Sequence, residues 1–246
     1  MNRFYHSSPI ELKQKIHLSN QVAHHATHVL RLKTEDKIIL FHNDPYDYSA
    51  VITQINKKTV EVYIDSKFEN QKNPTIHLRL FQSLSSSEKM DWIIQKSVEL
   101  GVGSIIPMYS KRSNIKLQGS RAEKKLSHWQ QVIISACEQS GRSSLPKISL
   151  PKKIEECLSL KNEKNGNHLK LILSPKEKNT LQSLNNPSVK NIDIMIGPEG
   201  GFTEEELNQT IKSNFVPIGL GPRILRTETA PLSILSILQY KYGDFA

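Results

Sequence analysis

The sequence predicts an α/β protein with a parallel sheet in its larger, C-terminal part. From Thr75 onward, apolar runs typical of strands alternate with stretches of helical periodicity, which indicates a parallel sheet with helices on its faces. Near the C-terminus, two glycine-containing loops follow short apolar runs, at 197–201 and 220–230. In sheets of this kind such loops lie at the carboxyl ends of strands, where ligands bind. Two of them close together in the sequence predict a single cleft.

The first 72 residues predict a smaller module rich in strands. Ser19 or Asn20 can cap a short helix that runs to Arg31. The β-type runs that follow are 37–41, 48–55 and 59–64. Turns at 43–45 and 56–58 separate them, so we expect a meander, although the pattern does not choose among small barrels. Residues 69–74 read as a linker, and we divide the chain into domains 1–72 and 73–246.

In the larger domain, the sequence pattern predicts strands and helices in alternation. The expected strands are 75–82, 103–108, 170–173, 192–196 and 215–219. The expected helices are 85–100, 121–139, one that opens at Thr203, and 230–242. We expect Trp92 and Trp129 in the core. Residues 161–167 are polar and predict an exposed loop.

The first glycine loop does not fit a phosphate site. No Gly-Lys-Ser/Thr sequence follows Gly201, and the next helix opens with Thr203 and Glu206 in the spacing of a capping box. Glu204 and Glu205 add negative charge to the first turn, which favours the helix dipole and would repel a phosphate. A neutral or cationic ligand suits the loop better, and a tight surface turn is the alternative.

The second loop places charged residues at the start of an apolar helix. Leu220 and Gly221 can bring backbone close to a flat ligand, because glycine has no Cβ. Arg223, Arg226 and Glu228 follow within the same loop. Packing alone does not explain three charges there, so we expect them at the edge of a pocket.

Composition and charge narrow the classes of protein. Apolar residues make up 37% of the chain and charged residues 23%, as in a soluble globular protein. The sequence lacks an apolar signal core and a run long enough for a membrane span, and its two cysteines give no disulfide framework, so we expect a cytoplasmic protein. Of the net charge of +9, residues 1–72 carry only +2, and the basic residues cluster between 111 and 147. This pattern indicates a polyanionic partner, and a lysine-rich solvated surface is the alternative.

Histidines concentrate in the N-terminal module. His24 and His28 have the i, i+4 spacing that zinc sites sometimes use, but no motif supplies a third ligand. We expect no metal site, and a helix surface that faces solvent or RNA.

Long motifs resemble one known family. Ile-Gly-Pro-Glu-Gly-Gly at 196–201 and Leu-Gly-Pro-Arg-Ile-Leu-Arg-Thr-Glu-Thr-Ala at 220–230 closely resemble the RsmE family, the 16S ribosomal RNA uridine-N3 methyltransferases of the SPOUT superfamily. The resemblance extends to residues 88–92, 95–101 and 136–142. It implies a C-terminal trefoil knot that holds S-adenosylmethionine, a PUA-like RNA-binding domain at the N-terminus, and a homodimer. Periodicity could not predict a knot, because ordinary connection rules argue against one.

The resemblance also implies roles for individual residues. The cofactor-binding residues would be Leu173, Ile196, Gly197, Pro198, Glu199, Gly200, Gly201, Leu220, Gly221, Ile224, Leu225, Thr229 and Ala230. The RNA-binding residues would be Arg3, Arg31, Lys89, Lys111, Arg112 and Arg142. The family usually places an arginine near position 28, and this departure argues against RNA contact by His28.

The reaction sets the expected catalytic residues. The uridine N3 carries a proton and is a poor nucleophile until the proton leaves, so a cation near the uracil oxygens would stabilise the anion that forms. Arg226 and Arg223 are the expected cations. Glu228 would orient an arginine or accept the proton, and solvent is the alternative acceptor. The alternatives are an RNA-binding protein without catalysis, and a knotted methyltransferase that acts on transfer RNA or on a ribose hydroxyl.

Overall fold

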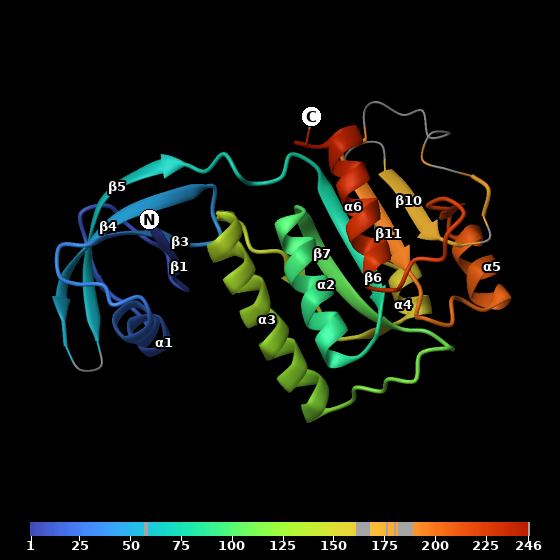
Figure 1. Ribbon diagram of the computed structural model, residues 1–246, viewed down its shortest axis with the longest axis horizontal. Coiled ribbons are helices and arrows are strands. Elements are labelled where there is room, and N and C mark those ends of the chain that lie inside the picture. Colours follow the sequence, from blue (N-terminus) through green and yellow to red (C-terminus); the bar gives the residue numbers. More distant parts are fainter. Residues whose placement is uncertain (57–58, 161–167, 176, 180, 182–188, 246) are drawn as a thin grey trace. The chain divides into compact units, whose positions relative to one another are not determined.

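The computed structural model describes residues 1–56, 59–160, 168–175, 177–179, 181 and 189–245. The chain divides into two compact units (Figure 1). The first unit comprises residues 1–73 together with 137–145, and the second comprises 74–136 and 146–246. The expected loop at 161–167 lies outside the described residues. None of the helices in the described ranges combines the length and the apolar character that a membrane crossing requires.

The first unit is built on a five-stranded sheet in the order β1-β3-β4-β5-β2. Its strands are β1 (Asn2–Tyr5), β2 (Lys15–His17), β3 (Lys37–Phe41), β4 (Tyr46–Ile55) and β5 (Val60–Glu69). The antiparallel meander of β3, β4 and β5 confirms the predicted order, although β4 begins and β5 ends beyond the predicted limits. The sequence pattern does not predict the two edge strands. β1 pairs parallel to β3, and β2 pairs antiparallel to β5.

The predicted helix of the first unit changes its winding halfway. Helix α1 (Asn20–His24) begins at Ser19, whose hydroxyl accepts a hydrogen bond from the Val22 amide at 3.4 Å. The chain continues as a π-helix, η1 (His25–Val29). Ala23 and Ala26 are buried against the sheet in a core that includes Leu40, Ile52 and Val62.

The expected linker at 69–74 is in part built into the first unit. The Asn70 side chain is buried and donates to Asp47 Oδ2 at 2.9 Å and to the Gly141 carbonyl at 2.8 Å. Asp47 also accepts hydrogen bonds from both terminal nitrogens of Arg3. The linker prediction is therefore wrong at Asn70, because a buried carboxylate and a carbonyl satisfy its amide inside the unit.

The second unit holds a parallel sheet in the order β12-β10-β11-β6-β7-β8, and β9 also pairs with β7. The strands are β6 (His77–Ser83), β7 (Val102–Tyr109), β8 (Lys147–Ile148), β9 (Lys152–Lys153), β10 (His168–Leu173), β11 (Asn191–Ile196) and β12 (Val216–Ile218). Every residue of β11 is buried, as expected of a central parallel strand. The prediction of a parallel α/β sheet is confirmed.

Helices cover both faces of this sheet. They are α2 (Ser87–Glu99), α3 (Ser120–Ser140), α4 (Ile154–Leu158), α5 (Glu204–Lys212) and α6 (Thr229–Tyr242). Figure 1 shows α2 and α6 over one face and α4 on the other. On the α4 side, Ile154 and Cys157 pack on Phe81 and Met195. Trp129 is buried, as predicted, but Trp92 is 41% exposed, so the prediction for Trp92 is wrong.

A charged cluster crosses the middle of this sheet. Arg79 on β6 donates to both oxygens of Asp193 on β11, at 2.8 and 2.6 Å. His168 on β10 brings Nε2 to 3.1 Å from the same carboxylate. The Asp193 side chain is 3% exposed, so the pair has little contact with water. The charges stabilise each other only while both remain, because an unpaired buried charge is costly.

We predict that Asp193→Asn destabilises the protein strongly. The amide keeps the shape of the carboxylate but leaves the Arg79 charge without a partner, which costs about 3–5 kcal/mol in buried pairs. Chemical denaturation would measure the loss in free energy of unfolding. Glu99→Gln, which breaks the more exposed pair with Lys96, is the control and should cost less than about 1 kcal/mol. Equal losses in the two variants would contradict the prediction.

Candidate active site

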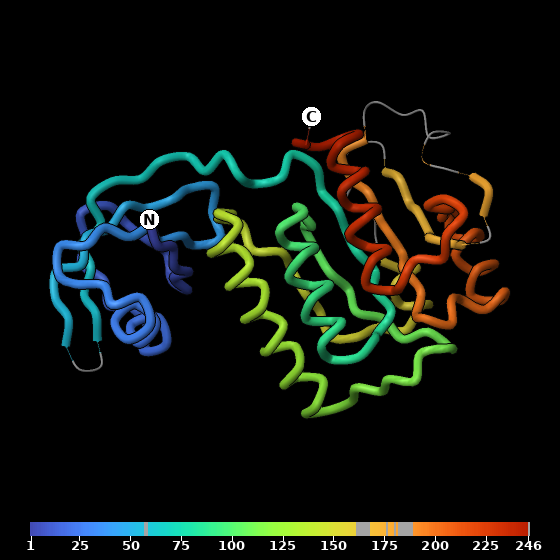
Figure 2. Tube along the Cα trace, viewed as in Figure 1, coloured from blue at the N-terminus to red at the C-terminus, as the bar shows by residue number. Residues whose placement is uncertain are grey.

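The two glycine loops emerge from strands that flank β10. The first loop follows β11 at Ile196 and the second follows β12 at Ile218, and β10 lies between these strands in the sheet. All three strands run parallel, so their carboxyl ends share one edge. Figure 2 shows the red segment that leads into α6 passing the end of the orange strand β11. The expected convergence of the two loops is therefore present.

A threonine joins the two loops. The Thr227 hydroxyl donates to the Gly197 carbonyl at 2.9 Å, and Gln82 at the end of β6 approaches the same hydroxyl at 3.4 Å. Thr227 and Gln82 are both buried. Neither residue is among the site residues expected from the sequence, although Thr227 lies within the second motif. These bonds fix the distance between the loops.

A lysine bridges the carboxylates of both loops. Lys89, in the first turn of α2, brings Nζ to 2.9 Å from Glu199 Oε1 and to 3.4 Å from Glu228 Oε2. Ser85 also donates to Glu199, at 2.8 Å. The hydrogen bond to Glu199 is the main cause of a raised Lys89 pKa. Partial burial acts to raise the pKa of Glu199, but the interactions with Lys89 and Ser85 outweigh it, and the net shift is downward.

The helix after the first loop begins as predicted. Thr203 Oγ1 accepts from the Glu206 amide at 3.2 Å, and Glu206 accepts from the Thr203 amide at 2.8 Å, which completes the capping box. Glu206 is buried and also accepts from the Lys111 amide at 2.7 Å. The Lys111 ammonium pairs with Glu205. The acidic first turn therefore ties α5 to the segment after β7.

Arg112 holds the first loop from outside. Its Nη1 donates to the carbonyls of Gly200 at 2.9 Å and Phe202 at 3.4 Å. Together with Lys89 and Lys111, it is one of three cations that the resemblance assigned to RNA. All three contact the first loop or the helix after it. These contacts hold the first loop and α5 in place, and the RNA-binding roles of the three cations stay predictions.

The expected catalytic residues differ in exposure. Arg223 and Arg226 are exposed in the second loop, and the Glu228 side chain is only 18% exposed beside Lys89. Ile224 is 84% exposed, whereas Leu220 and Leu225 are half-buried. Lys89 contacts both Glu228 and Glu199, and it thereby links Glu228 to the first loop. The catalytic roles stay predictions.

Two of the residues assigned to RNA are inside the first unit. Arg142 is 4% exposed, and the Arg3 side chain is 13% exposed in its pair with Asp47. Arg3 also donates to the Arg142 carbonyl at 3.3 Å. Both charges are largely withdrawn from solvent, where a contact with phosphate would form, and the RNA-binding roles of Arg3 and Arg142 stay predictions. Arg31, in contrast, is exposed.

We predict that Gly219→Ala distorts the second loop. A Cβ at Gly219 would lie 2.4 Å from the Glu177 carbonyl oxygen, which is backbone and cannot rotate away. Overpacking of this kind costs about 1–3 kcal/mol. Thermal or chemical unfolding would measure the loss. Gly119→Ala has open space and costs only the strain of a positive φ, so a smaller loss for Gly219→Ala than for this control would contradict the prediction.

Comparison with known proteins places the chain in one family. An RNA methyltransferase domain model matches residues 71–239, and an RNA methyltransferase PUA domain model matches 18–65. Ribosomal RNA small subunit methyltransferase E of Buchnera aphidicola (subspecies Acyrthosiphon pisum) is 38% identical over 99% of this chain and 94% of its own. The crystal structure of the methyltransferase E of Neisseria gonorrhoeae, bound to S-adenosylmethionine, is 36% identical with a TM-score of 0.92 over 100% of both chains. A methyltransferase of Legionella pneumophila, also solved with S-adenosylmethionine, is 35% identical with a TM-score of 0.93 over 99% of this chain and 98% of its own. The chain therefore belongs to the ribosomal RNA small subunit methyltransferase E family.

Proposed function

We propose that this protein transfers a methyl group from S-adenosylmethionine to N3 of a uridine near the 3′ end of 16S ribosomal RNA, on the assembled small subunit. The observation that carries the proposal is the pair of loops at adjacent strand ends, joined by Thr227 and bridged by Lys89. The near full-length match to methyltransferase E proteins, of which one was solved with this cofactor, supports it.

The residues of the two loops fit such a cofactor. Ile224 exposes an apolar side chain that an adenine ring would cover, and added Cβ atoms at Gly201 and Gly221 would meet only open space. Glu199 and Glu228 suit the positive charge of a sulfonium. We propose that Leu173, Ile196, Gly197, Pro198, Glu199, Gly200, Gly201, Leu220, Gly221, Ile224, Leu225, Thr229 and Ala230 hold it. When bound, the cofactor supplies an electrophilic methyl group.

The catalytic step requires alignment and a charge at the uracil. Transfer of the methyl group is an in-line displacement, so the chain must hold the base against the cleft at close approach. We propose that Arg226, with Arg223, stabilises the uracil oxygens as N3 loses its proton. Glu228, fixed beside Lys89, orients an arginine or accepts that proton. The exposure of both arginines suits contact with an RNA that arrives from solvent.

The remaining features of the proposal concern architecture and partners. We propose that the C-terminal loops form the trefoil knot of the SPOUT superfamily, that residues 1–72 form a PUA-like barrel and 73–246 the catalytic domain, and that the protein is a cytoplasmic homodimer. Exposed Ile237 and Tyr240 make α6 a candidate for the dimer interface. We propose that the RNA-binding residues are Arg3, Arg31, Lys89, Lys111, Arg112 and Arg142. Of these, Lys89, Lys111 and Arg112 would also position the first loop and the helix after it.

The test is transfer of labelled methyl from S-adenosylmethionine to small ribosomal subunits from cells that lack this protein, followed by mapping of the modified base. Label at one uridine near the 3′ end of 16S RNA, as N3-methyluridine, is the expected result. Label that appears only on transfer RNA or on a ribose hydroxyl would overturn the substrate. Absence of both label and cofactor binding would leave an RNA-binding protein without catalysis.

We predict that Arg226→Ala slows methyl transfer by about 100- to 1000-fold and leaves cofactor affinity within about twofold. The variant removes the cation that stabilises the uracil anion, and loss of one such group typically lowers kcat by about 100- to 1000-fold. Single-turnover transfer would measure the rate, and calorimetric titration with S-adenosylmethionine the affinity. Unchanged turnover would remove Arg226 from the mechanism.

We predict that Lys89→Met weakens cofactor binding and lowers kcat together. The substitution keeps the apolar stem but releases Glu199 and Glu228, which would then repel each other across the two loops. Lys96→Met on the same helix, where the lysine pairs with Glu99, is the control and should change neither quantity. If RNA affinity alone fell, Lys89 would be an RNA contact and not a positioning residue.

A further inference from the structure

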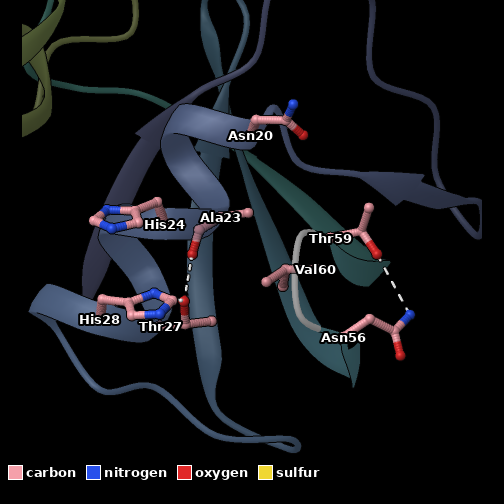
Figure 3. Close-up of a pocket in the computed structure, with 8 residues that line it drawn as sticks. All are labelled: Asn20, Ala23, His24, Thr27, His28, Asn56, Thr59 and Val60. Atoms are coloured by element: carbon pink, nitrogen blue, oxygen red, sulfur yellow. Dashed lines mark hydrogen bonds between the residues drawn. The ribbon is translucent and has the colours of Figure 1, made fainter.

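The first unit contains a pocket that the proposed mechanism does not use. It has a volume of about 290 Å³ and lies between the helix formed by α1 and η1 and the hairpin of β4 and β5. Its lining residues are Asn20, Ala23, His24, Thr27, His28, Asn56, Thr59 and Val60. Figure 3 shows His24 and His28 on the helix side and Asn56 and Thr59 on the hairpin side. The volume is at the lower end of small-molecule sites, so it suits one flat group rather than a large ligand.

Two imidazoles form an exposed stack at this pocket. The rings of His24 and His28 lie with centroids 4.5 Å apart and planes 8° from parallel. Both residues are exposed, and Thr27 Oγ1 lies 2.8 Å from His28 Nδ1, which fixes the orientation of that ring. Thr27 Oγ1 is anchored in turn on the Ala23 carbonyl at 2.8 Å. The pair therefore presents a rigid aromatic surface to solvent.

The backbone that carries the stack is unusual. The chain changes from α- to π-helix at His25, with the Leu30 amide bonded to the His25 carbonyl at 3.0 Å. The π-turn is the last turn of this helix, a position at which such turns occur, and it sets where the exposed residues at the helix end lie. Arg31, immediately after, has φ of +55°, and Val29 is 61% exposed. A helix end with strained backbone and exposed apolar surface favours a binding role over a purely structural one.

The aromatic and polar side chains of the pocket favour an unpaired nucleobase as the ligand. Unpaired nucleobases stack on aromatic side chains, histidine included, and are read by hydrogen bonds at their edges. The Asn20 amide lines the pocket. On the hairpin side Asn56 Nδ2 donates to Thr59 Oγ1 at 3.4 Å, so the second amide hydrogen of Asn56 and the hydroxyl hydrogen of Thr59 are the donors left for such an edge. A metal fits less well, because no group of three ligand side chains gathers anywhere in the described part of the chain. The stack would offer a metal only two nitrogen ligands.

We propose that this pocket binds one unpaired nucleobase of the RNA, stacked on the His24–His28 pair. The inference rests on the proposed function in that the RNA is taken as the substrate of the same protein. The proposal differs from the expectation that a histidine at position 28 argues against RNA contact. The stacked rings of His24 and His28 form a flat surface, and a nucleobase can stack on it. The site is separate from the glycine loops, which belong to the other compact unit.

The test uses the full-length protein and a fluorescently labelled single-stranded pentauridylate, with anisotropy as the measure of affinity. We expect His28→Ala to weaken binding about tenfold, as for loss of one stacked base. His28→Phe, which keeps a flat ring, should stay within about threefold of the native protein. His17→Ala, also an exposed histidine of the first unit, is the matched control and should bind as the native protein does.

A second probe separates base from backbone. A pentamer with abasic sites keeps the phosphates, so it should bind weakly and should not shift the imidazole NMR signals of His24 and His28, whereas pentauridylate should shift both. Equal binding or equal shifts with the abasic pentamer would show phosphate contact and overturn the proposal. Native affinity in His28→Ala would also overturn it. Methyl transfer by the native protein is measured in parallel: its absence with intact base binding would remove the proposed function and leave this site.

Discussion

The hydrogen bond from Thr227 to the Gly197 carbonyl is the interaction on which the candidate site depends. Its two partners follow strands that are not neighbours, because β10 lies between β11 and β12. The sheet sets the separation of the two strand ends, and the threonine closes the remaining distance. Gln82, at the end of β6, approaches the same hydroxyl and extends the connection across the sheet. The buried Thr227 hydroxyl costs little to bury, because the Gly197 carbonyl and the Gln82 amide both hydrogen-bond to it.

Charge around the loops is arranged in pairs rather than as a bare basic surface. Lys89 is shared by Glu199 and Glu228, and Lys111 pairs with Glu205. These cations contribute to the net charge of +9 but lose part of their attraction for phosphate, since nearby carboxylates offset them. Lys116, Arg121 and Lys124 are exposed in the same basic stretch. These three residues therefore keep more of their attraction for a polyanion than the paired cations beside the glycine loops do.

Much of the second unit could be predicted because local signals and tertiary structure agree there. The apolar run at β11 and the Thr203–Glu206 capping box each carry a physical cause that acts within a few residues. The burial of Asn70 and Arg142 could not be predicted in this way, because their surroundings come from segments distant in sequence. The same holds for β1, a four-residue edge strand whose pairing with β3 crosses more than thirty residues. The burial of Trp92 is predicted wrongly from its residue type. Tryptophan is buried on average, but the orientation of the helix that carries it decides whether a given tryptophan is exposed.

Several residues in the described part of the chain adopt a positive φ, and the cost of that backbone conformation depends on the residue type at each position. Gly201 and Gly221 adopt positive φ in the loops of the candidate site, where the absence of a Cβ removes most of the cost. Arg31 adopts φ of +55° with a full side chain, which costs about 1–3 kcal/mol. The Leu32 amide, bonded to the Ala26 carbonyl at 2.9 Å, holds the chain in that turn. The exposed end of η1 is therefore a fixed shape, and a fixed shape is what a stacking surface requires, because a ligand then loses no affinity to ordering the protein.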